Sequence, residues 1–522
     1  MKNPVVTVSL SLFVAFTATA VSGPLGYVMP RKSADIAALA LGVQLGDRGP
    51  ASLFARAGEL GVKWTRLQAG WPAVEREKGR YDFSEVDETV NAARANGIAP
   101  FVCLTGGNRL YSAAIPNPNP DPNWILIYGV KPAPPVLDEA AMAAWLRFVD
   151  AVVAHAKDRV THWEIWNEPN HYAYWGAKPD AASYGKLVRL TAARIRAVQP
   201  GAVIIAGALA GLDPKFVEGF LAEDTARAVD IVSFHNYAAL PEARIYLADD
   251  TWAALRAHNP KLQLWQGECG YPSASSTRDF RGVSPWGPTV QAKWLLRQSF
   301  IDTYFMRCSL SNYFKLYSSG DRAETQERAP AAPVDHILGF PAEATGRRVR
   351  GTGVNEKNLL ANPGLEPKPA FHAYQNLCAV FDGRYQRVEF DGRAAVRVTA
   401  PGQFSGVGQY DDAYPSVPLL AAFRAANGAA FLAYWLPWQP QEYTPKPARI
   451  ALRAPGFAFK EPVLINLLDG SVHPLPAPRQ ENGAAVFADL PMFDFPLVIA
   501  ERTEITLAKS PATPENEAVP RF

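Results

Sequence analysis

The chain has 522 residues, of which 48% are hydrophobic and 20% charged, and this composition is typical of globular rather than disordered proteins. The 52 Lys and Arg nearly balance the 50 Asp and Glu, so the sequence lacks the basic excess that binds nucleic acid. The length predicts roughly two to four domains.

Residues 1–20 have the pattern of a secretory signal peptide. Lys2 provides a positive start, Val5–Ala18 is apolar, and Ala18-Thr19-Ala20 has the small-residue form of a cleavage site. A permanent anchor is the alternative, but the apolar run is shorter than the ~20 residues that a spanning helix needs. We therefore predict an exported protein, secreted or periplasmic, that leaves the membrane after cleavage and continues with a lead-in segment over 21–37.

From residue 38 to residue 383, short apolar runs alternate with amphipathic stretches. Eight runs predict strands, at 38–46, 62–70, 98–106, 159–167, 202–211, 230–238, 262–270 and 306–317. Apolar residues at helical spacing lie between them, most clearly at 84–97, 138–158 and 183–201, and a last helix is expected at 367–383. Near-continuous apolar strands alternating with helices indicate an α/β fold with a parallel sheet covered on both faces. Eight such units predict a (β/α)8 TIM barrel. A doubly wound open sheet is the alternative, but no Gly-rich phosphate loop follows the first run.

The pattern changes after the barrel. Residues 384–506 contain short alternating runs broken by Gly, Pro and Asn, which predicts a small antiparallel β-sandwich. This sandwich could bind glycan or serve as a structural support. Residues 507–522 are polar and Pro-rich, and we expect them to be disordered.

The cysteines and histidines do not form a metal-binding pattern. The four cysteines are widely spaced without a C-x-x-C pair, and the eight histidines include no H-x-H or H-E-x-x-H arrangement. We therefore predict neither a metal nor an organic cofactor. The spacing leaves the disulfide pairing open.

Two glutamates, one hundred residues apart, end two of the predicted strands. Glu168 ends the fourth run in THWEIWNEPN, and Glu268 ends the seventh in WQGECGYP. Active sites of TIM barrels lie at the carboxyl ends of the strands, so both side chains are expected in one mouth. Two carboxylates facing each other across a cleft suit glycoside hydrolysis. For either glutamate alone, a strand-end ion pair is the alternative. Glu164, deeper on the same strand, is expected to be a buried partner for a base such as Arg66.

Aromatic residues gather in the segments that follow the predicted strands. Trp71 follows the second strand, Trp175 the fourth and Trp286 the seventh, while Tyr317 ends the eighth. Aromatic rings in such loops either pack the loops onto the body or stack on the apolar faces of sugars. We predict that these four residues line substrate subsites.

The sequence WNEP around Glu168 resembles the acid/base motif of the clan A retaining glycoside hydrolases. The longer stretch EIWNEPN is most similar to glycoside hydrolase family 39, the β-xylosidase-like family, or a neighbouring family, and so is the segment WPAVEREKGRYDFS that starts at Trp71. The resemblance implies that Glu168 is the acid/base and Glu268 the nucleophile. It also implies that Asn167 binds the sugar 2-hydroxyl.

The same resemblance assigns three supporting residues. Arg66 is expected to pair with the nucleophile and keep it ionised. Tyr237, in the segment SFHNY, is expected to steady the nucleophile through its hydroxyl, and His235 to line the same subsite. The sequence departs from the family at strand eight, where many members carry a stacking Trp and this chain has Lys315 nearby. Lys315 either contacts a hydroxyl or an acidic sugar, or is simply a strand-end cation.

Together these patterns predict a secreted, retaining glycoside hydrolase that cleaves β-glycosidic bonds of oligosaccharides or polysaccharides by double displacement. An α-L-arabinofuranosidase or an endo-glycanase of the same clan is the alternative among enzymes. A non-catalytic carbohydrate-binding protein on the same barrel is the alternative of another class.

Overall fold

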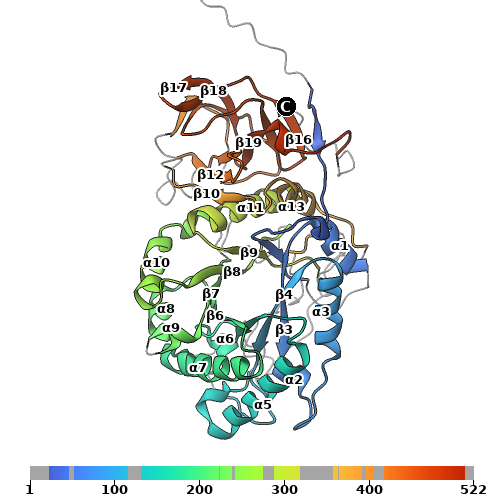
Figure 1. Ribbon diagram of the computed structural model, residues 1–522, viewed down its shortest axis with the longest axis vertical. Helices are drawn as coiled ribbons and strands as arrows, with labels where there is room; N and C mark the ends of the chain where they lie inside the picture. Colours follow the sequence, from blue (N-terminus) through green and yellow to red (C-terminus); the bar gives the residue numbers. More distant parts are fainter. Residues whose placement is uncertain are drawn as a thin grey trace, which may run out of the picture.

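The computed structural model describes residues 23–45, 52–115, 131–222, 224–237, 241–273, 287–317, 357–361, 364–390, 395–404 and 417–511. These residues form a closed parallel barrel and, beside it, two antiparallel sheets (Figure 1). The predicted signal peptide lies outside the described residues and stays a prediction.

Eight parallel strands form the barrel in chain order. They are β2 (Leu41–Val43), β3 (Trp64–Gly70), β4 (Ala99–Thr105), β5 (His162–Ile165), β6 (Val203–Ala210), β7 (Ile231–His235), β8 (Gln263–Cys269) and β9 (Leu310–Tyr313). The barrel closes where β9 pairs with β2, with Gly42 opposite Asn312. Each predicted apolar run contains one of these strands, so the predicted (β/α)8 barrel is confirmed.

Helices surround the strands (Figure 1). The larger ones are α1 (Ser52–Leu60), α3 (Ser84–Ala95), α5 (Glu139–Ala156), α7 (Ala181–Val198), α8 (Pro214–Leu221), α10 (Leu247–His258), α11 (Pro288–Phe300) and α13 (Pro369–Val380). Shorter turns of helix are η1 (Ser33–Asp35), α2 (Trp71–Val74), η2 (Pro135–Leu137), α6 (Tyr172–Trp175), α9 (Thr225–Ala228), η3 (Pro241–Arg244), the π-helical η5 (Ile301–Phe305) and η7 (Arg502–Glu504). Helix α5 illustrates how the local sequence specifies a helix. Asp138 caps it by accepting a hydrogen bond from the Ala141 amide, and Trp145, Phe148 and Val152 recur at helical spacing on its buried face.

The two antiparallel sheets form the predicted sandwich. One sheet has the strand order β10-β12-β13-β19-β15-β16-β1-β20 and the other β11-β14-β18-β17. Their strands are β1 (Gly26–Val28), β10 (Tyr385–Arg387), β11 (Val396–Ala400), β12 (Leu419–Ala425), β13 (Ala430–Trp435), β14 (Ala448–Pro455), β15 (Pro462–Asn466), β16 (Ser471–Pro474), β17 (Arg479–Glu481), β18 (Ala484–Met492), β19 (Leu497–Glu501) and β20 (Leu507–Ala508).

The two ends of the described chain join this sandwich, which the sequence did not predict. Strand β1 comes from the predicted lead-in segment, and its Tyr27 lies opposite Ser471 of β16 and Ala508 of β20. The prediction that 507–522 is disordered is therefore wrong for Leu507–Ala508. An added strand satisfies the backbone groups of a sheet edge, and local composition carries no record of that partner. Residues 512–522 lie outside the described part.

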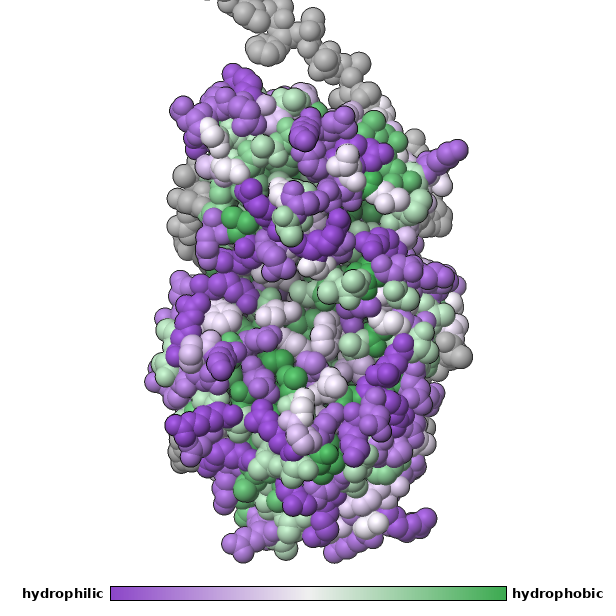
Figure 2. All heavy atoms as spheres, in the orientation of Figure 1, coloured by the Kyte–Doolittle hydropathy of each residue, from purple (hydrophilic) through white to green (hydrophobic). Residues whose placement is uncertain are grey.

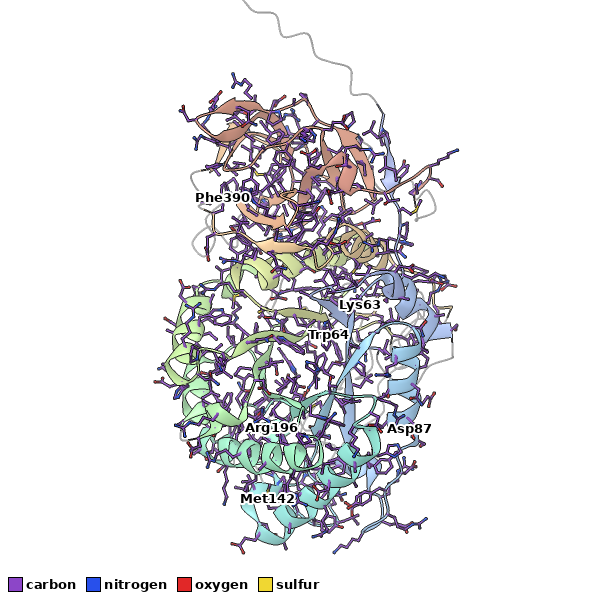
Figure 3. All side chains as sticks on the ribbon, in the orientation of Figure 1. Lys63, Trp64, Asp87, Met142, Arg196 and Phe390 are labelled. Carbon is purple, nitrogen blue, oxygen red and sulfur yellow. The ribbon has the colours of Figure 1, made fainter. Side chains whose placement is uncertain are left out.

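Side chains fill the inside of the barrel (Figure 3). At the amino ends of the strands, Phe101, Ile205, Ile231, Trp265 and Leu310 form a separate apolar cluster, against which Trp64 packs. The barrel is therefore a packed core and not a pore. The carboxyl ends of the strands lie on the opposite side of this cluster.

The visible outer face is mostly polar, with hydrophobic residues in separate patches (Figure 2). All four cysteines are buried and unpaired. Within the part of the chain that the structure describes, no helix has both the length and the hydropathy needed to cross a bilayer.

Helices α11 and α13 lie between the barrel and the sandwich (Figure 1). A buried ion pair joins α11 to the sandwich, because the Lys293 Nζ lies 2.9 Å from both carboxylate oxygens of Asp494 and neither side chain is exposed. Beside it, the Arg297 Nε donates to Glu242, which also accepts a hydrogen bond from Trp435 of β13. These contacts fix the sandwich against the barrel.

We expect Asp494→Asn to lower the free energy of unfolding by about 3–5 kcal/mol, because it leaves the Lys293 ammonium buried without its counter-charge. The matched control is Asp489→Asn, whose partner Arg449 is exposed and whose ion pair contributes at most about 1 kcal/mol. Urea denaturation of both variants measures the difference. A loss for Asp494→Asn no larger than that for Asp489→Asn would contradict the role of the buried pair.

Candidate active site

One buried arginine organises the carboxyl end of the barrel. Arg66 of β3 is fully buried and donates to three side chains: its Nε to Glu164 Oε2 at 2.6 Å, its Nη1 to Glu268 Oε2 at 2.9 Å, and its Nη2 to Asn167 Oδ1 at 2.8 Å. The rigid fork of a guanidinium suits such a three-way contact. The predicted pairs of Arg66 with Glu164 and with Glu268 are therefore present.

Glu164 is a support for this arginine. Its side chain is fully buried, and its second oxygen accepts a hydrogen bond from the Ser233 hydroxyl at 2.7 Å. A buried carboxylate needs partners of this kind. The structure places it beneath the site, where it neutralises part of the charge of Arg66.

Glu268, at the end of β8, is held as an ionised carboxylate. Its Oε1 accepts a short hydrogen bond from the Tyr237 hydroxyl, and its Oε2 accepts one from Arg66. Burial raises the pKa of Glu268, but the electrostatic effects of the neighbouring His235 and Arg66 and the Tyr237 hydrogen bond outweigh burial and bring the pKa below its ordinary value. A carboxylate that stays ionised in a buried site can act as a nucleophile.

Glu168 is presented by a tight turn after β5. Trp166 and Glu168 both have left-handed backbones, with φ of 70° and 48°. The turn is fixed on both sides, because the Trp166 amide donates to the Leu104 carbonyl and the Glu168 amide to the Ala208 carbonyl. Non-glycine residues in this conformation carry backbone strain, which is typical of functional sites.

A bulge in β6 supplies the carbonyl that holds Glu168. The pairing of β6 with β7 shifts register between Ala206 and Leu209. Gly207 makes the bulge possible, because its φ is 112° and a Cβ there would lie 2.3 Å from the Ser233 carbonyl oxygen. The Ala208 amide then donates to the Ser233 hydroxyl, which links the turn to Glu164.

His235 lies between the two glutamates. Its Nδ1 is 2.9 Å from Glu168 Oε1 and 3.9 Å from Glu268 Oε2. These two carboxylate oxygens are therefore no more than about 7 Å apart, a bound that includes the ~5–5.5 Å carboxyl separation of retaining glycosidases. Glu168 and Glu268 remain partly accessible, with 10% and 13% of their side chains exposed.

A cavity of about 730 Å³ adjoins this group of residues. The ends of β3 and β4 and the segment Lys131–Pro132 line it, and Asn167 and Tyr174 contribute from the side of Glu168. The Asn167 Oδ1 accepts a hydrogen bond from Arg66, which leaves the amide NH2 of Asn167 available to donate to a ligand. The volume is that of a small-ligand pocket.

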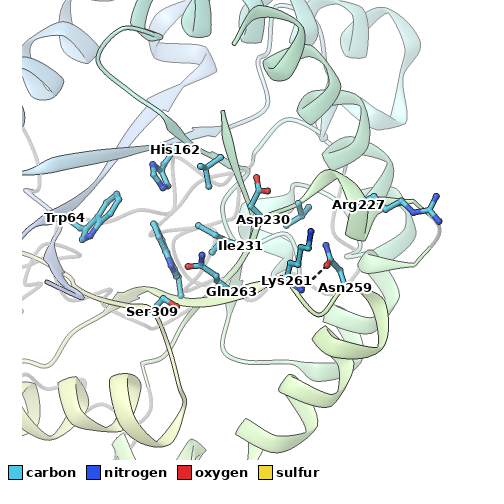
Figure 4. A pocket seen from close by; sticks show the side chains of 12 residues that line it. Trp64, His162, Arg227, Asp230, Ile231, Asn259, Lys261, Gln263 and Ser309 are labelled. Carbon is cyan, nitrogen blue, oxygen red and sulfur yellow. Dashed lines mark hydrogen bonds between the residues drawn. The ribbon is translucent and has the colours of Figure 1, made fainter. Parts of the chain in front are cut away.

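A second cavity, of about 640 Å³, lies at the other end of the barrel (Figure 4). Its lining includes Trp64, His162, Ile231 and Gln263, which begin β3, β5, β7 and β8. Glu168 and Glu268 lie at the opposite ends of these parallel strands. This cavity is therefore separate from the site around Arg66.

The aromatic residues that were predicted to bind substrate are not all accessible, whereas the predicted polar residues lie together at the site. Trp71 and Trp175 are fully buried: Trp71 stacks on Tyr111, and Trp175 packs edge-on against Trp166. The prediction that they bind substrate is wrong, because their rings offer no accessible face. Tyr317 is also part of the hydrophobic core, and its contact with substrate stays a prediction. Trp286 lies outside the described residues.

Three residues of the site were missed in the sequence. Ser233 supports Glu164, and Gln266 accepts hydrogen bonds through its Oε1 from the backbone amides of Glu268 and Asn236. Lys357 lies over the Tyr237 ring, 4.2 Å from its centroid. Gln266 and Glu268 are two residues apart on one strand, so the period of two could have placed them on the same face. Lys357 has no such signal, because it comes from a distant segment.

We expect Tyr237→Phe to raise the pKa of Glu268, because the variant removes a hydrogen bond that stabilises the ionised carboxylate. The change needs no substrate to detect: NMR titration of side-chain 13C-labelled glutamate follows Glu268 in both proteins. Tyr434→Phe, whose hydroxyl donates to a backbone carbonyl in the sandwich, is the control and should leave this titration unchanged. An unchanged Glu268 titration in Tyr237→Phe would contradict the assigned hydrogen bond.

Among the described residues, no group of three or more His, Cys, Asp and Glu side chains is placed to hold a metal ion. Glu164, Glu168 and Glu268 are instead separated by Arg66 and His235. The site is one of carboxylates held by cationic and hydroxyl donors.

Comparison with known proteins identifies the fold. No protein-family model and no curated protein match the sequence. Among solved structures, the chain is similar to a family 39 glycoside hydrolase from Bacteroides cellulosilyticus WH2, with a TM-score of 0.58, 18% identity, and coverage of 89% of this chain and 81% of that one. A monomeric β-xylosidase from Caulobacter crescentus CB15 follows, with a TM-score of 0.53, 19% identity, and coverage of 92% and 97%.

A GH30 endoxylanase from Clostridium papyrosolvens C71 is also similar, with a TM-score of 0.55, 12% identity, and coverage of 92% of this chain and all of that one. At such low identities the similarity establishes the shared fold, a barrel followed by a sandwich, and nothing finer.

Proposed function

We propose that this protein is a retaining glycoside hydrolase that cleaves β-glycosidic bonds and is exported by its N-terminal segment. The observation that carries the proposal is the unequal environment of the two glutamates. Both oxygens of Glu268 accept hydrogen bonds, from Arg66 and Tyr237, which favours the ionised form. Glu168 contacts His235 through one oxygen, and its side chain is otherwise open to a proton transfer. Pairs of carboxylates in different environments divide acid and nucleophile roles in this way.

The reaction follows from these roles. In the first step, a Glu268 oxygen attacks the anomeric carbon while Glu168 gives its proton to the leaving glycosidic oxygen, so that one C–O bond forms as the other breaks. In the second step, Glu168 takes a proton from water, and the water oxygen displaces Glu268 from the anomeric carbon. The sugar leaves with its original configuration, and Glu168 is protonated again.

The surrounding residues support both steps. Arg66 keeps Glu268 ionised before the attack and carries a positive charge next to it when the carboxylate is released. His235 contacts Glu168 and lies near Glu268, so it interacts electrostatically with both carboxylates. Asn167 precedes Glu168 in the chain, and we propose that its amide donates to the sugar 2-hydroxyl, a contact that strengthens in glycosidase transition states.

The substrate is proposed to be an oligosaccharide or polysaccharide. A xylose-type sugar is the first to test, because two of the similar structures are named a β-xylosidase and an endoxylanase. An α-L-arabinofuranosidase or an endo-glycanase would use the same pair of glutamates. The assay therefore has to include these substrates.

The test is hydrolysis of aryl β-xyloside, β-glucoside, β-galactoside and α-L-arabinofuranoside substrates, and then of xylan and other β-glycans. Proton NMR at early times identifies the first anomer released. Release of the anomer with the substrate's configuration supports the proposal, and release of the opposite anomer would show inversion and contradict it. Binding of glycans without cleavage of any substrate would favour the non-catalytic alternative.

A further inference from the structure

Strand β8 bulges just before it presents Glu268. On the side of β7, the register shifts between the pair that contains Gln266 and the pair that contains Glu268. On the side of β9, it shifts between the pairs that contain Gln266 and Cys269. A bulge places an extra residue in one strand and disrupts the ladder locally. The backbone of Glu268 therefore depends on contacts other than regular strand pairing.

A buried side chain supplies such contacts. Gln266 is fully buried, and its Oε1 accepts hydrogen bonds from the backbone amides of Glu268 and Asn236, both at 3.2 Å. Next to it, the Asn312 side chain donates to the Gly267 carbonyl at 3.0 Å. Only the oxygen of the Gln266 amide can accept hydrogen bonds, so the direction in which this amide faces decides whether the bulge is held.

Behind Gln266 lies a buried carboxylate without a counter-charge. Asp302 of η5 is fully buried, and it accepts hydrogen bonds from the Gln298 amide and from the Ser311 hydroxyl, both at 2.6 Å. Among the described residues, no cationic side chain lies within ion-pair distance of it. Burying a carboxylate in this way costs free energy, and proteins rarely do so without a cation.

The surroundings of Asp302 bring its titration close to neutral pH. Burial raises the pKa of Asp302 to about 7, while hydrogen bonds from Ser311, Gln298 and Gln266 lower it. The titratable side chains that face Asp302 stay neutral, because burial raises the pKa of each; they are Cys269, Tyr271, Cys308 and Tyr374. The donors that hold Asp302 in its ionised form are therefore all uncharged.

The ionised carboxylate favours one orientation of Gln266. The Gln266 amide stabilises the charge of Asp302, although its Nε2 has no partner at full hydrogen-bond geometry among the described residues. An ionised carboxylate only accepts hydrogen bonds, so it attracts the NH2 of Gln266 and leaves the Oε1 facing the Glu268 amide. On the other side, Gln298 links Asp302 to Tyr271, whose hydroxyl donates to the Gln298 Oε1 at 2.6 Å. Asp302 is thus connected to the chain both before and after Glu268.

We propose that Asp302 is a positioning residue for Glu268: its carboxylate orients the Gln266 amide, which in turn fixes the backbone of the strand end that carries the proposed nucleophile. The inference rests on the proposed function, because that function assigns the attack to Glu268. Asp302 acts only through Gln266 and Gln298, and it takes no part in the proton transfers of the reaction.

The first test is Asp302→Asn, which keeps the shape of the side chain but can donate to the Gln266 oxygen and turn it away from Glu268. Looser contacts of Glu268 with Arg66 and Tyr237 should raise the pKa of Glu268 by about 1, the weight of one hydrogen bond. For the same reason kcat should fall about tenfold, with KM within about twofold of wild type. NMR titration of 13C-labelled glutamate and steady-state kinetics measure these changes.

Asp494→Asn is the matched control, because Asp494 is also a fully buried carboxylate but pairs with Lys293 on the side of the sandwich. It should leave the Glu268 titration and kcat unchanged. If Asp302→Asn does not fold, Ser311→Ala keeps the carboxylate and removes one of its donors. This variant raises the pKa of Asp302, so its kcat relative to wild type should be lowest below pH 7 and rise as the carboxyl ionises.

A double variant tests the route through Gln266. Gln266→Met removes the amide that Asp302 orients, so adding Asp302→Asn to it should lower kcat by no more than about twofold. Losses that multiply in the double variant would overturn the inference, and so would an unchanged Glu268 titration in Asp302→Asn. If that titration is unchanged while wild type cleaves a glycan with retention, the proposed function stands and this inference fails. If the titration moves but wild type cleaves no glycan, the positioning of Glu268 stands and the proposed function fails.

Discussion

Glu268→Ala is expected to reduce kcat by about 10,000-fold or more, a loss of about 5.4 kcal/mol of transition-state stabilisation. The variant removes the atom that is proposed to attack the anomeric carbon, so the proposed covalent intermediate cannot form. It also leaves Arg66 and Tyr237 without the carboxylate that both contact. The measurement is steady-state hydrolysis of the best aryl glycoside found for the wild type.

Azide makes this prediction specific to a nucleophile. A small anion can occupy the space that the Glu268 carboxylate leaves, and it attacks the anomeric carbon of an activated aryl glycoside directly. The product is then a glycosyl azide of inverted configuration, which NMR identifies. Full activity in Glu268→Ala would show that the nucleophile is another residue, and a retained azide product would assign Glu268 the other role.

Glu168→Ala is expected to lower kcat/KM for substrates with poor leaving groups by about 100- to 10,000-fold, the range that general acid catalysis contributes. Substrates with a dinitrophenyl leaving group need no proton and should lose far less in the first step. Their second step still lacks a base to activate water, so the glycosyl-enzyme should accumulate. A burst of dinitrophenol followed by slow turnover would reveal this intermediate.

Azide again separates the roles. With Glu268 in place, azide attacks the glycosyl-enzyme without needing a base, and it should accelerate turnover of Glu168→Ala and give an azide of retained configuration. Glu164→Gln is the control, because Glu164 is four residues earlier on the same segment but is fully buried against Arg66. Azide should not accelerate that variant. Equal losses for all leaving groups in Glu168→Ala would contradict the acid/base role.

The two carboxylates are coupled through the groups between them. His235 contacts Glu168 and lies near Glu268, and it is among the neighbours that lower the pKa of Glu268. Arg66 links Glu268 to Glu164 and, through Asn167, to the turn that carries Glu168. A change at any of these positions is therefore expected to alter both steps of the proposed reaction.

Much of the fold was readable from local pattern. The alternation of apolar runs and helical segments predicted the eight barrel strands, because a strand buried on both faces is apolar along its length whatever its partner. Glu168 and Glu268 are both at strand ends, and this predicted that they lie together at the carboxyl end of the barrel, because the carboxyl ends of parallel barrel strands share a face. These two arguments needed nothing beyond the order of residues along the chain.

The tertiary structure decided which distant side chains meet. Arg66 could be paired with Glu164 or Glu268 from the sequence, but only closure of the barrel brings both, and Asn167, to one guanidinium. Trp71 and Trp175 look like binding residues in loops, yet the same hydrophobic rings gain more by packing into the core, and the sequence carries no sign of which environment they reach.

The same holds for strands β1 and β20, since they pair although they come from opposite ends of the described chain. The sequence by itself therefore determined the helices and strands and the candidate functional side chains, because periodicity and residue type are local properties. Their contacts, and with them the electrostatic difference between the two glutamates, depend on distances that exist only in the folded chain.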